Sequence, residues 1–121
     1  MGESSGRTFD LLTLGQVLLR LSPPDNDRLS RGDTFVKQVG GAELNVAVGA
    51  SLLGLHTGVI SKLPSHDIGS FMKGKIRSFG VSDDYFLYDN SPSARVGIYY
   101  YENGAYPRNP QVIYDRNNSS F

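Results

Sequence analysis

The spacing of hydrophobic residues along the chain predicts alternating strands and helices. Residues 9–14 and 57–61 are short apolar runs, typical of strands that are covered on both faces of a parallel sheet. Apolar residues between positions 42 and 53 fall on most sides of a predicted helix, which indicates deep packing against that sheet, and Gly54 is placed to end the helix. A strand, a helix and a strand in this order favour a right-handed parallel crossover.

A second predicted helix has the clearest apolar face, and it ends at Gly80. The apolar residues on this face are Ile68, Phe71, Met72, Ile76 and Phe79. We interpret Met72 and the two phenylalanines as core residues rather than as cofactor contacts. Residues 85–88 predict a third strand, so the expected fold class is α/β, with helices packed on an open sheet.

Segments 17–39 and 95–115 predict a second, smaller sheet. Each segment holds two short strand-like runs separated by residues that favour turns, and the later turn is expected around Asn103 and Gly104. Three consecutive tyrosines at 99–101 cannot all face one core, because side chains on a strand alternate between its two faces. At least one tyrosine is therefore expected on an outer face.

Composition and charge describe an ordinary globular domain or part of one. The chain has 121 residues, and its 12 basic and 12 acidic residues cancel, which argues against binding to nucleic acid or to an anionic membrane. It has no cysteine, and no apolar run long enough to span a bilayer or to act as a signal peptide, so we expect a cytoplasmic protein. Residues 1–8 are expected to be a disordered polar leader, with residues 9–121 forming the folded part.

The glycine pair before the first predicted helix is a candidate ligand site. Gly40 and Gly41 would allow a polar ligand to approach the free amides of the first helical turn closely, and Asn45 adds a side chain that both donates and accepts hydrogen bonds. Such a site suits a small molecule rich in hydroxyl groups. The alternative is a turn that requires glycine only for packing.

The predicted hairpin carries a second set of candidate residues. Tyr99 and Tyr114 are aromatic residues with a polar end, and Arg116 would share the side of Tyr114 if the strand continues. Because arginine can bind a carboxylate through two parallel hydrogen bonds, this face suits a hydroxylated carboxylate. The alternatives are a solvated charge at Arg116, and tyrosines that belong to the sheet surface or to a subunit contact.

The order of these motifs resembles the N-terminal part of ribokinase-like (PfkB) sugar kinases. The motifs are a strand ending at Gly15, Gly-Gly-Ala-Glu-Leu-Asn at 40–45, Lys-Leu-Pro at 62–64 before Asp-Ile-Gly at 67–69, and the tyrosine-rich hairpin. Residues 40–47 are most similar to the 2-keto-3-deoxygluconate kinase branch. The resemblance implies a ribokinase-like doubly wound α/β sheet with a small β-sheet lid, and phosphoryl transfer from ATP to a sugar hydroxyl.

The resemblance also assigns roles to individual residues. It places Gly41 and Asn45 against the sugar. On the lid, it places Tyr99, Tyr114 and Arg116 near the hydroxyl groups and the carboxylate of the substrate. It implies ATP and Mg²⁺ as cofactors, but the catalytic aspartate and the nucleotide site of the family have no matching segment here.

The family's catalytic aspartate is expected beyond Phe121, the last residue of this chain. Asp115 is no substitute for it, and Gly74-Lys75 does not have the spacing of a phosphate-binding loop. We therefore expect a fragment that carries the sugar-binding and lid parts and is inactive alone.

Two departures from the family pattern leave the exact substrate open. Gln16 stands where an acidic residue is usual, and Pro64 stands where glycine is common. The alternatives are a kinase of a neutral sugar, such as a fructokinase, and a non-catalytic module for sugar binding or oligomerisation. The exposed aromatic residues also predict a homodimer formed through the lid, with Tyr100 at the interface because it points away from Tyr99 and Tyr101.

Overall fold

The computed structural model describes residues 8–104 and 107–121. The predicted disordered leader lies outside these residues except for Thr8. Within the described part, neither helix has the length and apolar character that crossing a bilayer requires.

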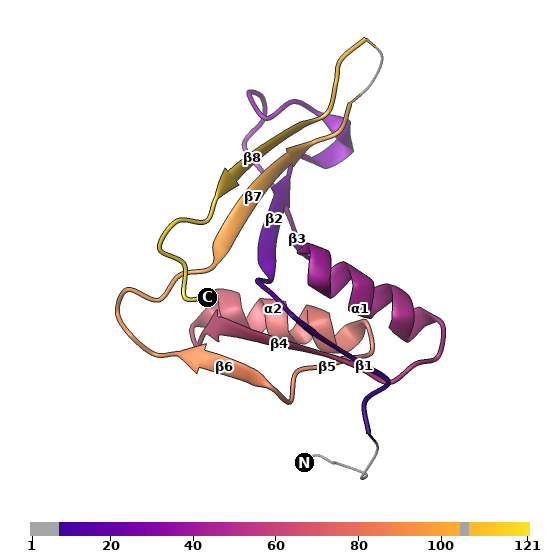
Figure 1. The fold of residues 1–121 in the computed structure, drawn as a ribbon. Helices are drawn as coiled ribbons and strands as arrows, with labels where there is room; N and C mark the ends of the chain where they lie inside the picture. Colours follow the sequence, from indigo (N-terminus) through magenta and orange to yellow (C-terminus); the bar gives the residue numbers. More distant parts are fainter. Residues whose placement is uncertain (1–7, 105–106) are drawn as a thin grey trace.

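A parallel sheet with two helices on one face forms the lower part of the molecule (Figure 1). The strand order is β1-β4-β5, and β6 also pairs with β4. These elements are β1 (Leu11–Leu14), α1 (Ala42–Leu52), β4 (Thr57–Pro64), α2 (Asp67–Ser78), β5 (Val81–Ser82) and β6 (Phe86–Asp89). The α/β fold class predicted from the sequence is confirmed.

The second sheet rises from the parallel sheet as a separate layer (Figure 1). Its strand order is β3-β2-β7-β8, in which β2 and β7 run parallel and the outer pairs are antiparallel. The strands are β2 (Leu18–Ser22), β3 (Val36–Gly40), β7 (Gly97–Glu102) and β8 (Gln111–Asp115). The chain enters this sheet after β1, leaves it at the start of α1, and re-enters it after β6.

A single hydrophobic core lies between the helices and the parallel sheet and extends to the base of the second sheet. Leu44 and Ala47 of α1 and Met72 and Ile76 of α2 contribute its helical side, and all four are fully buried. Val17, Leu19 and Val96 join the core from the second sheet and its connections. The core therefore holds the base of the second sheet against the start of α1.

The side chains of β1 and α1 are less buried than their apolar sequences predicted. Leu14 in β1 is 66% exposed, and Leu52 and Leu53 at the end of α1 are 79% and 82% exposed. Both helices contribute to one core cluster on one face of the sheet, so alternate β1 side chains on the opposite face have no cover within the described residues. Likewise, α1 buries one stripe of side chains, whereas the sequence predicted apolar contacts on most of its sides.

Several boundaries also differ from the predicted ones. β4 continues three residues beyond the expected end, and the two-residue strand β5 was not predicted. The hairpin connection is longer than a turn at Asn103 and Gly104, because Glu102 pairs with Gln111. Residues 105 and 106 of that connection lie outside the described residues. Proline lacks the amide hydrogen needed for strand pairing, and two prolines, Pro107 and Pro110, precede β8.

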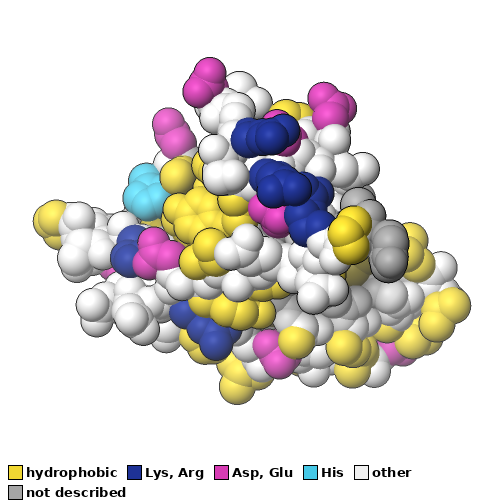
Figure 2. Space-filling view, turned by 90° about the horizontal axis from the view of Figure 1, so that it is seen from above, with side chains coloured by type: hydrophobic (Ala, Val, Ile, Leu, Met, Phe, Trp, Pro, Cys, Tyr) yellow, Lys and Arg dark blue, Asp and Glu magenta, His cyan; other side chains and the backbone are white. Residues whose placement is uncertain are grey.

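The far end of the second sheet is cross-linked by polar contacts. Glu102 is buried, accepts a hydrogen bond from the backbone amide of Leu29 at 2.8 Å, and lies 3.6 Å from the Arg108 guanidinium. Seen from above, basic and acidic side chains lie beside one another on this face (Figure 2). These contacts tie the connection between β2 and β3 to the β7–β8 hairpin.

Candidate functional site

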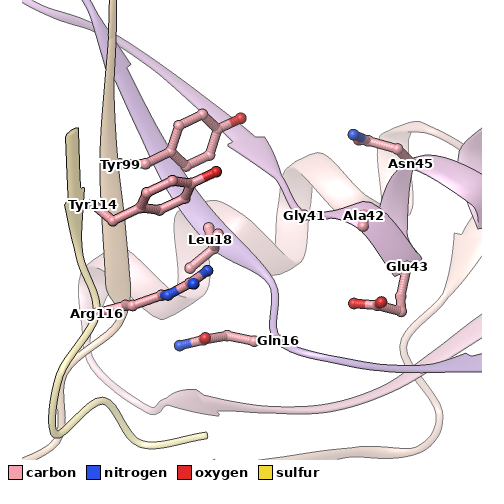
Figure 3. Close-up of a pocket in the computed structure, with 9 residues that line it drawn as sticks. All are labelled: Gln16, Leu18, Gly41, Ala42, Glu43, Asn45, Tyr99, Tyr114 and Arg116. Carbon is pink, nitrogen blue, oxygen red and sulfur yellow. The ribbon is translucent and has the colours of Figure 1, made fainter. Parts of the chain in front are cut away.

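A pocket of about 430 Å³ opens at the junction of the two sheets and the start of α1. Figure 3 shows its lining side chains converging from three parts of the fold: the segment from Gln16 to the start of β2, the first turns of α1, and the β7–β8 hairpin with the residue that follows it. The lining residues are Gln16, Leu18, Gly41, Ala42, Glu43, Asn45, Tyr99, Tyr114 and Arg116. Five of the six sequence-predicted site residues are therefore brought together, and Gly40 is not among the lining residues.

The hairpin supplies an aromatic wall that ends in a cation. Tyr99 and Tyr114 are register partners on β7 and β8, and their ring centroids lie 5.9 Å apart. The Arg116 guanidinium lies 4.5 Å from the centroid of the Tyr114 ring. A cation over an aromatic face is held by electrostatic attraction, so Tyr114 positions Arg116 at the pocket wall.

Gly40 lies behind this wall and is buried. A Cβ atom at this position would collide with the Tyr99 hydroxyl group, which lies directly over the glycine. The lack of a side chain at Gly40 therefore leaves room for Tyr99. For Gly40, this agrees with the alternative interpretation that the turn requires glycine only for packing.

Gly41 forms the turn from β3 into α1, and its backbone requires glycine. Its φ of 125° is a conformation that residues with side chains rarely adopt, and a Cβ atom there would lie 2.6 Å from the Gln16 carbonyl oxygen. No side chain caps the helix at this residue, and the first helical hydrogen bond runs from the Asn45 amide to the Gly41 carbonyl at 2.9 Å. The preceding amides of the first turn lack helical partners at the edge of the pocket.

Four lining residues were not among the predicted site residues: Gln16, Leu18, Ala42 and Glu43. Glu43 is the most consequential, because its carboxylate lies beside Gly15 at the end of β1, and its backbone carbonyl accepts a hydrogen bond from Thr13 at 3.1 Å. The available signal was its place in the first turn of a helix that opens with a glycine pair. An acidic residue there also has an ordinary role in stabilising the helix.

A polar network holds residues 119 and 120 against the base of both sheets. The Gln16 side-chain amide donates to the Ser119 hydroxyl at 2.7 Å, and the Ser120 hydroxyl donates to Asp89 at 2.7 Å. Hydrogen bonds from the Ser91 backbone amide, and then from the Ser120 and Ser91 side chains, lower the pKa of Asp89 to about 2. This network links the pocket residue Gln16 to the end of the described chain.

Phe121 follows this network and takes no part in the pocket. Its side chain is 52% exposed, and it is not among the nine lining residues. No aspartate of residues 8–104 and 107–121 lines the pocket either, since Glu43 is its one acidic residue. The catalytic aspartate expected beyond Phe121 therefore stays a prediction about a longer parent protein.

Comparison with known proteins identifies the family. Residues 8–121 match the sequence profile described as pfkB family carbohydrate kinase. The chain belongs to this family. This finding confirms the resemblance inferred from the ordered motifs.

Relatives and solved structures of this family match most of the chain. A 2-dehydro-3-deoxygalactonokinase from Haloferax volcanii is 41% identical over 109 residues, covering 90% of this chain and 33% of the relative. The crystal structure of 2-dehydro-3-deoxygluconokinase from Thermotoga maritima matches with a TM-score of 0.85 and 41% identity, covering 91% of this chain and 33% of that one. A PfkB family carbohydrate kinase from Listeria grayi matches with a TM-score of 0.84 and 33% identity, covering 92% of this chain and 34% of that one. The chain thus spans about a third of the length of these relatives.

Proposed function

We propose that the protein containing this chain transfers a phosphoryl group from ATP to a hydroxyl group of a sugar acid, 2-keto-3-deoxygluconate or a close isomer. In this proposal, the described pocket binds the sugar acid and the second sheet acts as a lid over it. The relatives named for the 2-dehydro-3-deoxy sugar acids support this substrate class.

The observation that carries the proposal is the position of Arg116 at the pocket wall. Its guanidinium is held over Tyr114, and within the described residues it has no salt-bridge partner, so its hydrogen-bond donors are available to a ligand. A carboxylate can accept two parallel hydrogen bonds from such a group. The tyrosine hydroxyl groups and Asn45 can bind the hydroxyl groups along the rest of the sugar acid.

ATP, Mg²⁺ and the catalytic aspartate are proposed to lie in parts of the parent protein beyond Phe121. Among residues 8–104 and 107–121, no three His, Cys, Asp or Glu side chains are grouped so that they could hold a metal ion. When bound, ATP supplies the phosphoryl group and Mg²⁺ neutralises its charge. The residues of this chain bind and orient the sugar acid.

Steady-state kinetics of the parent protein test this proposal. We expect a higher kcat/KM for 2-keto-3-deoxygluconate than for fructose, which has hydroxyl groups but no carboxylate. Arg116→Ala should lower kcat/KM for the sugar acid by about ten- to a hundredfold, because a charge-assisted hydrogen-bond pair contributes about 1.5–3 kcal/mol. The same substitution should change the use of fructose much less. Equal losses on both substrates would discard the carboxylate role and favour a neutral-sugar kinase.

A further inference from the structure

The pocket has two charged side chains on opposite walls. Of its nine lining residues, Arg116 carries a positive charge and Glu43 a negative one. Figure 3 shows Arg116 entering from the hairpin and Glu43 from the first turn of α1, on opposite sides of the pocket. A ligand that spans this pocket therefore meets a cation at one end and an anion at the other.

The Glu43 carboxylate is brought to the end of β1 by the absence of a side chain at Gly15. A Cβ atom built on Gly15 would lie 2.6 Å from Cγ of Glu43 and closer still to its carboxylate. The backbone of Glu43 is also anchored, because its carbonyl accepts a hydrogen bond from the Thr13 hydroxyl at 3.1 Å. Within residues 8–104 and 107–121, the carboxylate oxygens of Glu43 make no hydrogen bond or salt bridge, so they are available as acceptors.

Gln16 does not provide an equivalent group. Its side-chain amide already donates to the Ser119 hydroxyl at 2.7 Å, and Figure 3 shows this side chain extending away from Glu43. An amide is also uncharged, and hydrogen bonds to a charged group are about twice as strong as those between neutral groups. Glu43 is therefore the anionic acceptor among the pocket-lining residues.

We propose that Glu43 is a substrate-binding residue that accepts hydrogen bonds from sugar hydroxyl groups. Because it lies opposite Arg116, it also fixes the orientation in which a sugar acid binds. The sugar-acid part of this inference rests on the proposed function. A reversed ligand would bring its carboxylate to Glu43, where two negative charges repel each other, and would leave its hydroxyl end at Arg116. The two charged walls thus favour one orientation.

The inference can be tested with a ligand that keeps only one end of the substrate. 2-Oxobutanoate reproduces the keto-carboxylate end of 2-keto-3-deoxygluconate and lacks its hydroxyl groups, so it should inhibit the parent enzyme competitively. Glu43→Gln should raise the KM for 2-keto-3-deoxygluconate by about ten- to a hundredfold and leave the inhibition constant of 2-oxobutanoate within about twofold. Arg116→Gln should raise both constants.

Asp67→Asn is a matched control for the helix. Asp67 is an exposed acidic residue in the first turn of α2, as Glu43 is in the first turn of α1, but it does not line the pocket. Both neutral variants remove a favourable interaction with a helix dipole, so a purely structural role predicts similar losses of thermal stability and similar kinetics for the two. Glu43→Gln should differ from Asp67→Asn in the KM for the sugar acid.

The outcomes separate this inference from the proposed function. If the wild-type enzyme phosphorylates the sugar acid and Glu43→Gln leaves its KM unchanged, or alters both constants equally, the role of Glu43 is overturned and the proposed function stands. If 2-oxobutanoate does not inhibit the wild-type enzyme, the proposed direction of binding is overturned. If the parent enzyme phosphorylates only neutral sugars, the proposed substrate is wrong. In that case, an unchanged KM for those sugars in the Glu43→Gln variant would also overturn the role of Glu43 in binding hydroxyl groups.

Discussion

Replacing Gly41 by alanine should damage the protein more than replacing Gly54, although both glycines flank α1 and have positive φ angles of 125° and 90°. At Gly41, a side chain in this backbone conformation costs about 1–3 kcal/mol, and its contact with the Gln16 carbonyl at 2.6 Å adds about 1–3 kcal/mol. The smaller conformational freedom of alanine in the unfolded chain offsets about 0.4–1 kcal/mol. The expected net loss in the free energy of unfolding is therefore about 1–5.5 kcal/mol, with a middle value of about 3 kcal/mol.

Gly54 provides the matched control, because a Cβ atom there meets nothing within 4 Å. Only the backbone strain of about 1–2 kcal/mol remains, and the same offset applies, so Gly54→Ala should cost about 1 kcal/mol. Urea unfolding of the two variants of the parent protein measures the difference. Gly41→Ala should also raise the KM for the sugar acid, since any relief of the contact moves the first turn of α1. Equal losses of stability in the two variants, with unchanged KM values, would refute the close approach of Gly41 to the end of β1.

Three further predictions concern other parts of the chain. In α2, Gly69→Ala should destabilise the protein because the new Cβ atom meets the Pro64 carbonyl. Gly74 has open space around it, so Gly74→Ala should stabilise the helix by up to about 1 kcal/mol. Melting temperatures that shift in the same direction for both variants would contradict this. Tyr100 remains the predicted dimer contact, and its ring centroid lies 5.8 Å from that of Phe35. Light scattering should show that Tyr100→Arg converts a dimer to monomers. A monomeric wild-type protein would exclude the predicted dimer. The pKa of Asp89 is lowered from 3.8 to about 2, so its hydrogen bonds should stabilise the fold at pH values above 3.8. This stabilisation should be lost as the pH falls towards 2. Acid unfolding of the Asp89→Asn variant should lack this pH-dependent loss of stability.

Much of the fold could be predicted from the sequence because local patterns specify it. In the predicted apolar stripe of α2, Met72 and Ile76 are buried, whereas Ile68 and Phe79 near its two ends are 41% and 37% exposed. The glycines at 54 and 80, which were expected to end the two helices, have positive φ angles. The alternation of the three tyrosines also holds, since Tyr99 lies near Tyr114 while Tyr100 lies against Phe35. In each case the periodicity of a single element was sufficient.

The remaining features depend on contacts between distant segments, which periodicity does not specify. The exposure of Leu14 follows from both helices packing on the other face of the sheet. The place of Glu43 in the pocket depends on its close approach to Gly15, which is 28 positions earlier in the chain. The two-residue strand β5 is too short to have a pattern of its own, and its pairing with β4 defines it.

The most direct test of the proposed sugar-acid site is a crystal structure of the parent protein with 2-keto-3-deoxygluconate bound. We expect the substrate carboxylate within hydrogen-bond distance of the Arg116 guanidinium, between the β7–β8 hairpin and α1, with its hydroxyl groups toward Glu43 and Asn45. A sugar acid bound outside this pocket, or bound with its carboxylate at the first turn of α1, would contradict the proposed site.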